Sequence, residues 1–225
     1  MIPIWKDIAV FLDATPEGAE IGRHAAALAS RYGAHLVGIY GIPHSVIHPE
    51  ESYARGSSAI SGVISRMRLQ DETKAVTAAR QFRALATDFD ISSEFRVVWQ
   101  NGLGDEGSLR ALHADLIVAA HPRPVDLPIN WTAEKLLLAT GTPVLLVPSA
   151  WSGVTIGTKV LLAWNRSREA RRAIIDALPF ITAAKAVTIL TVDSGRDPEM
   201  FGTEPGANVA EHLARHGAEA KVANV

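Results

Sequence analysis

The feature that most constrains the fold is a regular alternation between short apolar runs and segments with helical spacing. The continuous apolar run Ile8–Leu12 is typical of a parallel strand that is covered on both faces. A helical pattern follows it, beginning at the capping signal of Thr15 and Pro16 and ending at Gly33. Repetition of this strand–helix order predicts βαβ units and a parallel sheet.

Five apolar runs precede residue 150, and they predict one α/β domain with an open five-stranded parallel sheet flanked by helices. A polar, irregular stretch is expected over Pro43–Gly62, a long helix over Val63–Asp88 and a shorter helix over Thr132–Ala139. The predicted strands are Ile8–Leu12, Ala34–Ile42, Ser92–Gln100, Asp115–Ala120 and Pro143–Pro148.

After a Ser/Gly/Thr-rich linker the pattern begins again, and Asn165 and Glu169 align with Asp13 and Glu17. We therefore predict a complete domain over residues 1–149, a linker over 150–157 and a partial second copy over 158–225. A half-sheet exposes an unpaired edge and an apolar face, which either a partner chain or further chain is expected to cover. The sequence has the organisation of a shortened tandem protein.

Composition excludes several classes of function. The net charge is −2, so no basic face for nucleic acid is expected. The absence of cysteine excludes disulfides, thiol catalysis and Cys-ligated zinc. The N-terminus does not resemble a signal peptide, and no apolar run approaches the roughly 20 residues of a membrane span. We expect a cytoplasmic protein with no membrane partner.

Two features lie where an α/β sheet ordinarily binds ligands, at the carboxyl ends of strands. Asp13 ends the first strand, and the alternatives to ligand binding are that it caps the following helix or is solvated. The second feature is the loop Ala119–Trp131, which lies between a strand and a helix in the position of a phosphate loop. It contains three prolines, which lack an amide hydrogen, and no glycine: AAHPRPVDLPINW.

The order and spacing of these segments resemble the universal stress protein family, in its tandem-domain type with a truncated second domain. The resemblance implies a Rossmann-like fold similar to that of the adenine nucleotide alpha hydrolases. The matching segments of the first copy are DIAVFLDATPEG, HLVGIYGI, ADLIVAA and TAEKLLLATGTPVLLVPSA. Those of the second copy are KVLLAWNRSREARRAIIDALP and GANVAEHLARHG.

The family also implies a nucleotide site. In members that bind ATP, an Asp at the end of the first strand and the backbone of the second strand hold adenine and ribose. A Gly-x-x-Gly segment, nine residues and then Gly-Ser or Gly-Thr hold the phosphates, because glycine lets backbone amides approach closely. Carried onto this chain, the candidate ligand-binding residues are Asp13, Gly38, Ile39, His121, Arg123, Asn130 and Thr132.

The phosphate loop departs from that pattern. The Gly-Ser pair falls on Asn130 and Trp131, and the two earlier glycines have no counterparts. We therefore expect that ATP is not bound through the usual Gly-rich loop and that no cofactor is firmly implied, although ATP in an altered geometry stays an alternative. His121 and Arg123 either contact an anion or are solvated, and capping of a helix is the simpler role for Asn130 and Thr132.

No metal site and no catalytic set is expected. His44, His48 and the carboxylates of Glu50 and Glu51 are close in sequence, but Pro43 and Pro49 interrupt a regular helix there. The pair His212 and His216 lies on a helical pattern with no further ligand nearby. The glycines Gly102, Gly104 and Gly107 lack the spacing of a nucleotide-binding loop, and no nucleophile elbow is present.

The sequence favours a non-catalytic stress-response module that acts through dimerisation, a small ligand or a protein partner. The alternative is a universal stress protein that binds or hydrolyses ATP. Tandem members of the family pack their domains through the last strand, and this chain has one such strand. The resemblance therefore implies a homodimer formed through Pro143–Val147.

Overall fold

The computed structural model describes residues 5–42, 49–99, 112–129, 131–149, 151, 153, 155–192 and 206–225, with only the backbone described for 49–61. Contacts divide the chain into two units, which are treated separately below. The N-terminal unit is Trp5–Ser152, and the C-terminal unit contains Gly153–Val225.

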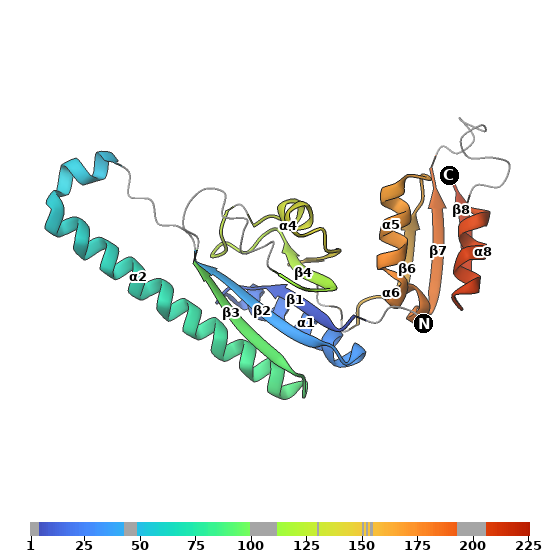
Figure 1. The fold of residues 1–225 in the computed structure, drawn as a ribbon, viewed down its shortest axis with the longest axis horizontal. Coiled ribbons are helices and arrows are strands. Elements are labelled where there is room, and N and C mark those ends of the chain that lie inside the picture. The colour runs from blue at the N-terminus through green and yellow to red at the C-terminus, as the bar shows by residue number, and fades with distance from the viewer. Residues whose placement is uncertain are drawn as a thin grey trace. The chain divides into compact units, whose positions relative to one another are not determined.

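The N-terminal unit is built on a five-stranded, entirely parallel sheet, as the sequence predicts (Figure 1). The strand order is β3-β2-β1-β4-β5, so the chain changes direction across the sheet between β1 and β4. In sheets of this kind ligands bind beyond the carboxyl ends of the strands at that point. The strands are β1 (Asp7–Phe11), β2 (His35–Ile42), β3 (Ser93–Trp99), β4 (Leu116–His121) and β5 (Val144–Pro148).

Among the described residues, the helices that accompany this sheet are α1 (Pro16–Tyr32), α2 (Pro49–Asp88) and α4 (Ala133–Thr140). The predicted limits of α1 are confirmed, since Thr15 is its N-cap and Gly33 its C-cap, with φ of 62°. A Cβ atom at Gly38 would lie 2.7 Å from the ring of Phe82, which shows how closely α2 packs on β2. The other face of β1 and β2 packs against Leu136 of α4.

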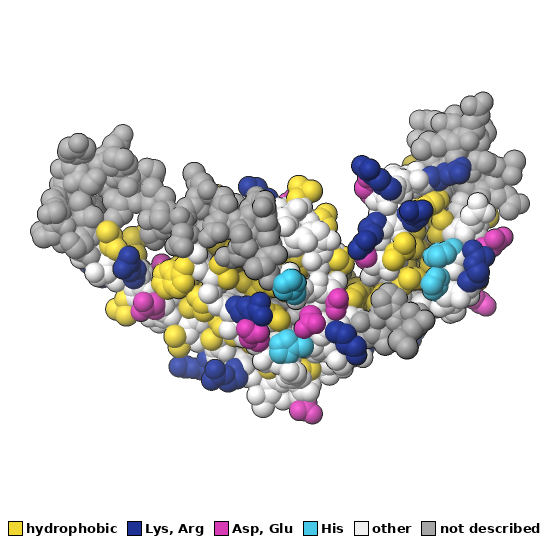
Figure 2. Space-filling view, in the orientation of Figure 1, with side chains coloured by type: hydrophobic (Ala, Val, Ile, Leu, Met, Phe, Trp, Pro, Cys, Tyr) yellow, Lys and Arg dark blue, Asp and Glu magenta, His cyan; other side chains and the backbone are white. Residues whose placement is uncertain are grey.

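Helix α2 is longer than predicted. The expected irregular stretch Pro43–Gly62 is wrong from Pro49 onward, because the helix begins there; residues 43–48 lie outside the described part of the chain. Proline is well tolerated at the first helical position, where its missing amide hydrogen is not needed, and acidic residues follow it in the sequence. Figure 1 shows the N-terminal half of α2 extending beyond the sheet. Among its described side chains, α2 exposes Ile64, Met67, Leu69 and Val76, and hydrophobic side chains are visible on this face of the N-terminal unit in Figure 2.

The C-terminal unit contains a parallel three-stranded sheet in the order β6-β7-β8. The segment after β6 forms two helices that meet at Ala177, because Pro179 lacks the amide hydrogen that would continue the first one. The elements are β6 (Lys159–Ala163), α5 (Arg168–Asp176), α6 (Leu178–Ala183), β7 (Ala186–Thr191), α8 (Ala207–Arg215) and β8 (Ala220–Asn224).

Within the described residues, none of the helices combines the length and the apolar character that crossing a membrane requires.

Candidate functional site

The candidate site is the carboxyl edge of the N-terminal sheet, where Asp13 follows β1. The Oδ1 atom of Asp13 accepts the backbone N–H of Thr15 at 3.0 Å and also accepts the Thr15 hydroxyl. The Thr15 Oγ1 atom in turn accepts the N–H of Gly18 at 3.1 Å and so caps α1. Asp13 therefore forms an Asx turn that joins the end of β1 to the first turn of α1.

The close approach of α1 to this turn requires a glycine. A Cβ atom at position 18 would lie 2.3 Å from Asp13 Oδ1 and 2.5 Å from the Asp13 backbone oxygen. Contacts that short do not occur between a Cβ and oxygen, so Gly18 lets the helix start directly over the carboxylate.

The second carboxylate oxygen of Asp13 faces the loop after β4. Asp13 Oδ2 accepts the backbone N–H of Asp126 at 3.4 Å, and the Asp13 side chain is completely buried. The side chain of Asp126 also pairs with Lys74 of α2, with 2.7 Å between Nζ and Oδ1. The loop is thus attached both to the end of β1 and to α2.

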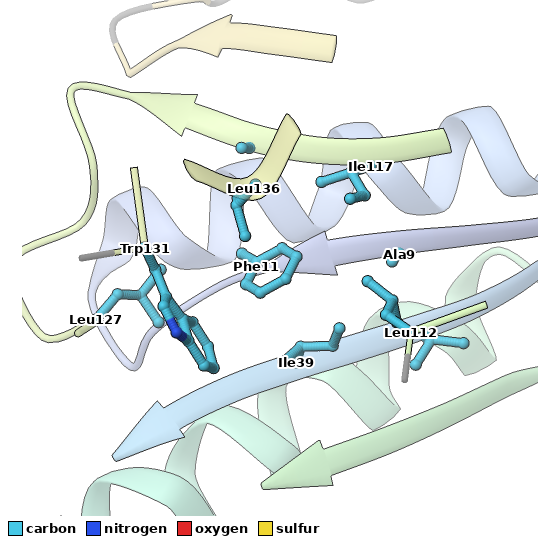
Figure 3. Packing of buried hydrophobic residues seen from close by; sticks show 10 residues of the cluster. Ala9, Phe11, Ile39, Leu112, Ile117, Leu127, Trp131 and Leu136 are labelled. Atoms are coloured by element: carbon cyan, nitrogen blue, oxygen red, sulfur yellow. The ribbon is translucent and has the colours of Figure 1, made fainter. Parts of the chain in front are cut away.

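An indole ring from the same loop covers the ends of β1 and β2 (Figure 3). Trp131 is 3% exposed, and its ring meets that of Phe11 edge to face, with 5.1 Å between the centroids. A Cβ atom at Gly41 would lie 2.5 Å from the Trp131 ring and 2.6 Å from the Pro128 ring. Both side chains therefore lie directly on the backbone of β2, at the place where the strand order predicts a ligand.

The core position of Trp131 was not predicted, although the sequence carries a signal for it. Trp131 immediately precedes the N-cap Thr132, and Leu136 is the fourth residue of α4. Apolar residues at these two positions form a hydrophobic staple that fixes how the chain enters a helix. Both belong to the same buried cluster as Phe11.

The arginine of the loop is directed at the backbone of the loop itself. Arg123 donates from Nη1 to the backbone oxygen of Pro124 at 2.7 Å and to that of Leu127. His121, at the end of β4, is exposed and forms a cis peptide bond with Pro122. The guanidinium thus satisfies backbone acceptors of a loop that has few amide donors.

Of the other predicted site residues, those that the structure describes either cap a helix or lie within a strand. Thr132 caps α4 by accepting the N–H of Lys135 at 3.4 Å, which confirms the predicted capping role. Gly38 and Ile39 are buried within β2, and the Ile39 backbone oxygen accepts the N–H of Leu12 at 3.2 Å. Asn130 lies outside the described residues.

Acidic groups around this edge affect Tyr40, near the end of β2. Burial raises the pKa of Tyr40 to about 12, and the charges of Asp126, Asp71 and Asp13 act in the same direction. Burial also raises the pKa of Asp71, against the effect of Lys74.

The candidate metal ligands are mostly outside the described side chains, namely His44, His48, Glu50 and Glu51, as are the glycines Gly102, Gly104 and Gly107. The rings of His212 and His216 lie 4.7 Å apart, and burial lowers the pKa of His212, helped by the neighbouring charges. Among the described side chains, no group of three or more His, Cys, Asp or Glu residues is placed to hold a metal ion.

No protein-family model matches the chain, and no curated protein matches it significantly by sequence. Several solved structures do resemble it in fold. A universal stress protein from Archaeoglobus fulgidus DSM 4304 is similar over 97% of this chain and 77% of its own, with a TM-score of 0.59 and 13% identity. A protein of unknown function from Pseudomonas aeruginosa PAO1 covers 98% of this chain and 74% of its own, with a TM-score of 0.51 and 18% identity.

A third solved structure, a universal stress protein from Archaeoglobus fulgidus in complex with dAMP, covers 64% of this chain and 98% of its own, with a TM-score of 0.41 and 16% identity. The similarity to the first of these structures extends over 97% of the chain, so it includes both the five-stranded parallel sheet of the N-terminal unit and the three-stranded sheet of the C-terminal unit. This chain has the universal stress protein fold.

Proposed function

We propose that this chain is a non-catalytic universal stress protein-like module whose loop after β4 replaces a nucleotide at the edge of the N-terminal sheet. The observation that carries the proposal is the position of Trp131, which lies buried against Phe11 and directly on the backbone of Gly41. An aromatic ring from the protein itself thus occupies the ends of β1 and β2, where a base would be expected to stack. The module acts through protein partners.

The hydrogen bonds of the loop support the same proposal. Both oxygens of Asp13 already accept hydrogen bonds within the chain, from Thr15 and from Asp126. The guanidinium of Arg123 is directed at the carbonyl oxygens of its own loop. A ribose or phosphate would have to displace these bonds, and each buried group left without a partner costs about 1–3 kcal/mol.

The test is a calorimetric titration of the whole chain with ATP, with and without magnesium, together with an assay for ATP hydrolysis. We expect no binding heat at millimolar nucleotide and no turnover. Micromolar binding that is lost in Asp13→Ala would overturn the proposal. Asp13→Asn is the matched control, since an amide oxygen keeps the Asx turn, as Asn165 does in the C-terminal unit.

An adenine nucleotide remains the alternative ligand, because a protein of similar fold is in complex with dAMP. Titrations of the unaltered chain and of a Trp131 variant with ATP, AMP and cAMP distinguish a module that does not bind nucleotides from one that does. Binding that strengthens when Trp131 is replaced by glycine would mean that the indole competes with a base. Binding by the unaltered chain would instead support the nucleotide-binding function.

For the partner, we propose a second copy of this chain that pairs through Pro143–Val147. Strand β5 forms an edge of the sheet, and the adjacent helix α4 exposes Leu137 and Leu138, the latter 84% exposed. Leu146 of β5 is also exposed, so apolar side chains continue across both elements. Contiguous exposed apolar side chains beside an unpaired edge are typical of a protein interface.

The solution mass of the chain tests this interface. We expect a dimer at micromolar concentration that Leu146→Lys converts to a monomer. Leu69→Lys is a matched control, because Leu69 is also exposed but lies on α2. A monomeric wild-type mass would contradict the proposal, as would a dimer that Leu146→Lys leaves intact.

A further inference from the structure

Two histidines lie on the same side of α8 at its C-terminal end. His212 and His216 are four residues apart, and their rings meet at 65° with 4.7 Å between the centroids. Both side chains are partly exposed, and two neighbouring histidines are visible on the surface of the C-terminal unit in Figure 2. Residues at this spacing are neighbours on a helix, so the two imidazoles can reach a common ligand.

The backbone under the two rings is held in place. Leu213, on the adjoining face of α8, is completely buried in the core of the C-terminal unit. Beyond His216 the chain turns at Gly217, which has φ of 82°, and the N–H of Ala218 donates to Leu213 O at 3.0 Å. This closing turn fixes the end of the helix, and with it the position of His216.

Helix α2 of the N-terminal unit ends with the same turn. Asp90 takes the place of Gly217 with φ of 50°, and the N–H of Ile91 donates to Ala86 O at 3.0 Å. Each helix leads into the third strand of its repeat, β3 or β8, which pairs in parallel with the second strand. Ile91 therefore corresponds to Ala218, and the residues before these two correspond one to one.

This correspondence shows which side chains the fold uses at the two positions. Leu85 corresponds to His212, and Phe89 corresponds to His216. The two apolar residues are also partly buried, and a Cβ atom at Gly22 of α1 would lie only 3.1 Å from Leu85. Apolar side chains at such places stabilise a fold by removing apolar surface from water. Packing alone therefore gives no reason for two adjacent imidazoles at these positions.

Two adjacent imidazoles are a pair of nitrogen ligands for a metal ion. Imidazole nitrogen suits zinc, nickel and copper, whereas magnesium and calcium prefer oxygen. Two histidines four residues apart on one face of a helix are also the zinc-binding pair of the His-Glu-x-x-His motif. The spacing and the contact between the rings of His212 and His216 thus have the geometry of a two-histidine metal site.

We propose that His212 and His216 bind a late first-row divalent cation, Zn²⁺, Ni²⁺ or Cu²⁺. Water supplies the remaining ligands, since among the described side chains no group of three His, Cys, Asp or Glu residues surrounds a possible metal position. The bound ion links two successive turns at the end of α8 and stabilises the folded C-terminal unit by mass action. The inference does not depend on whether the N-terminal unit binds a nucleotide.

The test is a titration of the full chain with Zn²⁺, followed through the imidazole nitrogen signals in NMR spectra. We expect the signals of both rings to shift along one saturation curve, because a single ion contacts both. Cu²⁺ should bind more tightly than Ni²⁺ or Zn²⁺, in the order that nitrogen ligands generally show. Hydrogen exchange in β7 should become slower in saturating Zn²⁺, since the ion binds only the folded unit.

Three variants make the result specific. His216→Gln should weaken Zn²⁺ binding by about tenfold or more, a loss that is typical even for residues that only support a metal ligand. Ala214→His together with His216→Gln keeps the number of histidines but places the second ring on another side of α8, so the affinity should stay low. His212→Leu together with His216→Phe restores the apolar pair of the N-terminal unit, and should abolish binding in a chain that still folds.

The control is the other pair of histidines four residues apart, His44 and His48, which lie outside the described residues. His44→Gln together with His48→Gln should leave the shifts of the α8 histidines and their Zn²⁺ affinity unchanged. His121→Gln, which removes an exposed histidine of the N-terminal unit, should also have no effect on them. Exchange in β7 without metal reports that each variant is still folded.

Three results would overturn the proposal. The first is that millimolar Zn²⁺ shifts the signals of only one of the two rings, or of neither. The second is an unchanged affinity at α8 when the second histidine is moved to position 214, because binding would then depend on the number of histidines and not on their contact. The third is Zn²⁺-dependent protection of β7 that persists in the variant with Leu and Phe at the two positions.

Discussion

The same strand-to-helix turn occurs twice in this chain, once buried and once exposed. Asp13 accepts the N–H of Thr15 at 3.0 Å, and Asn165 accepts the N–H of Ser167 at 3.1 Å. The hydroxyl of the third residue then caps the helix in both units. The turn therefore forms from local sequence alone, whereas the burial of Asp13 comes from the loop that crosses it. An aspartate at this place is explained by the turn before any ligand is invoked.

The largest effect on stability is expected from Trp131, which belongs to the loop that buries the turn at Asp13. Trp131→Ala should destabilise the N-terminal unit by about 3–5 kcal/mol, because it leaves a cavity against Phe11. Chemical denaturation followed by exchange in β1 and in β7 measures the two units separately. Trp151→Ala is the control, since that ring is exposed. A loss of less than about 1 kcal/mol would mean that the indole does not hold the loop in place.

The second largest effect is expected from substitutions in the first turn of the helix that follows each strand-to-helix turn. Gly18→Ala should cost about 3 kcal/mol, because the new Cβ would meet Asp13 oxygens at 2.3 and 2.5 Å. The equivalent position in the second turn is Ala170, and Ala170→Gly should cost about 1 kcal/mol through helix propensity alone. Thermal unfolding of both variants checks the difference. Equal effects would show that the two helices do not differ in their approach to the turn.

The third largest effect is expected from substitution of Asp13 and Asn165, the side chains that form the two turns. Asp13→Ala should cost about 2 kcal/mol, because buried donors of Thr15 and Asp126 lose their acceptor. Asn165→Ala, at an exposed turn, should cost about 1 kcal/mol or less, since water replaces the lost bond. Denaturant midpoints measure both. A larger loss of stability in Asn165→Ala than in Asp13→Ala would contradict this difference between the buried and the exposed turn.

An effect of alkaline pH is expected from Tyr40 of the N-terminal unit. Tyr40 has its pKa raised from 10.0 to about 12 in the folded state, so folding favours its protonated form. The resulting stabilisation is complete below pH 10 and is lost as the pH rises through 12. Its counterpart in the second sheet, Thr191, does not titrate. Absorbance at alkaline pH and unfolding of Tyr40→Phe test this: the variant should lose less stability between pH 10 and 12 than the wild type does.

The smallest effect is expected at the ion pair between α2 and the loop. Lys74→Ala should change stability by about 1 kcal/mol or less, because both side chains are partly solvated. Exchange at the amide of Asp126 should nevertheless become faster, since the loop loses one of its two attachments. Lys135→Ala, an exposed lysine of α4, is the control. An unchanged exchange rate at the Asp126 amide would mean that the hydrogen bond to Asp13, and not the ion pair with Lys74, holds this part of the loop in place.

Much of the fold was predictable because its signals are local. Apolar runs gave the positions of the strands, and Thr15, Gly33 and Thr132 mark helix limits through backbone groups a few residues away. The start of α2 was missed because the polar stretch Pro43–Gly62 was interpreted as irregular and Pro49 as an interruption, whereas proline is well tolerated at the first position of a helix.

The candidate site was less predictable because its contacts join distant segments. The loss of glycines from the loop was visible in the sequence, and so was the bulk of Trp131. Their consequence, an indole on Gly41 and a second acceptor role for Asp13, depends on contacts between residues about a hundred positions apart. No periodicity within one segment carries that information.

The length of α2 has a consequence for how the molecule opens. A 40-residue helix is about 60 Å long at 1.5 Å per residue, whereas β2 has eight residues and spans about 27 Å. The C-terminal half is anchored by Phe82 and its neighbours, but the side chains over 62–70 are almost all exposed. We therefore expect two regimes in this helix: the half packed on β2 opens only when the N-terminal unit unfolds, whereas the exposed turns over 62–70 open in a local helix–coil equilibrium that leaves the sheet intact.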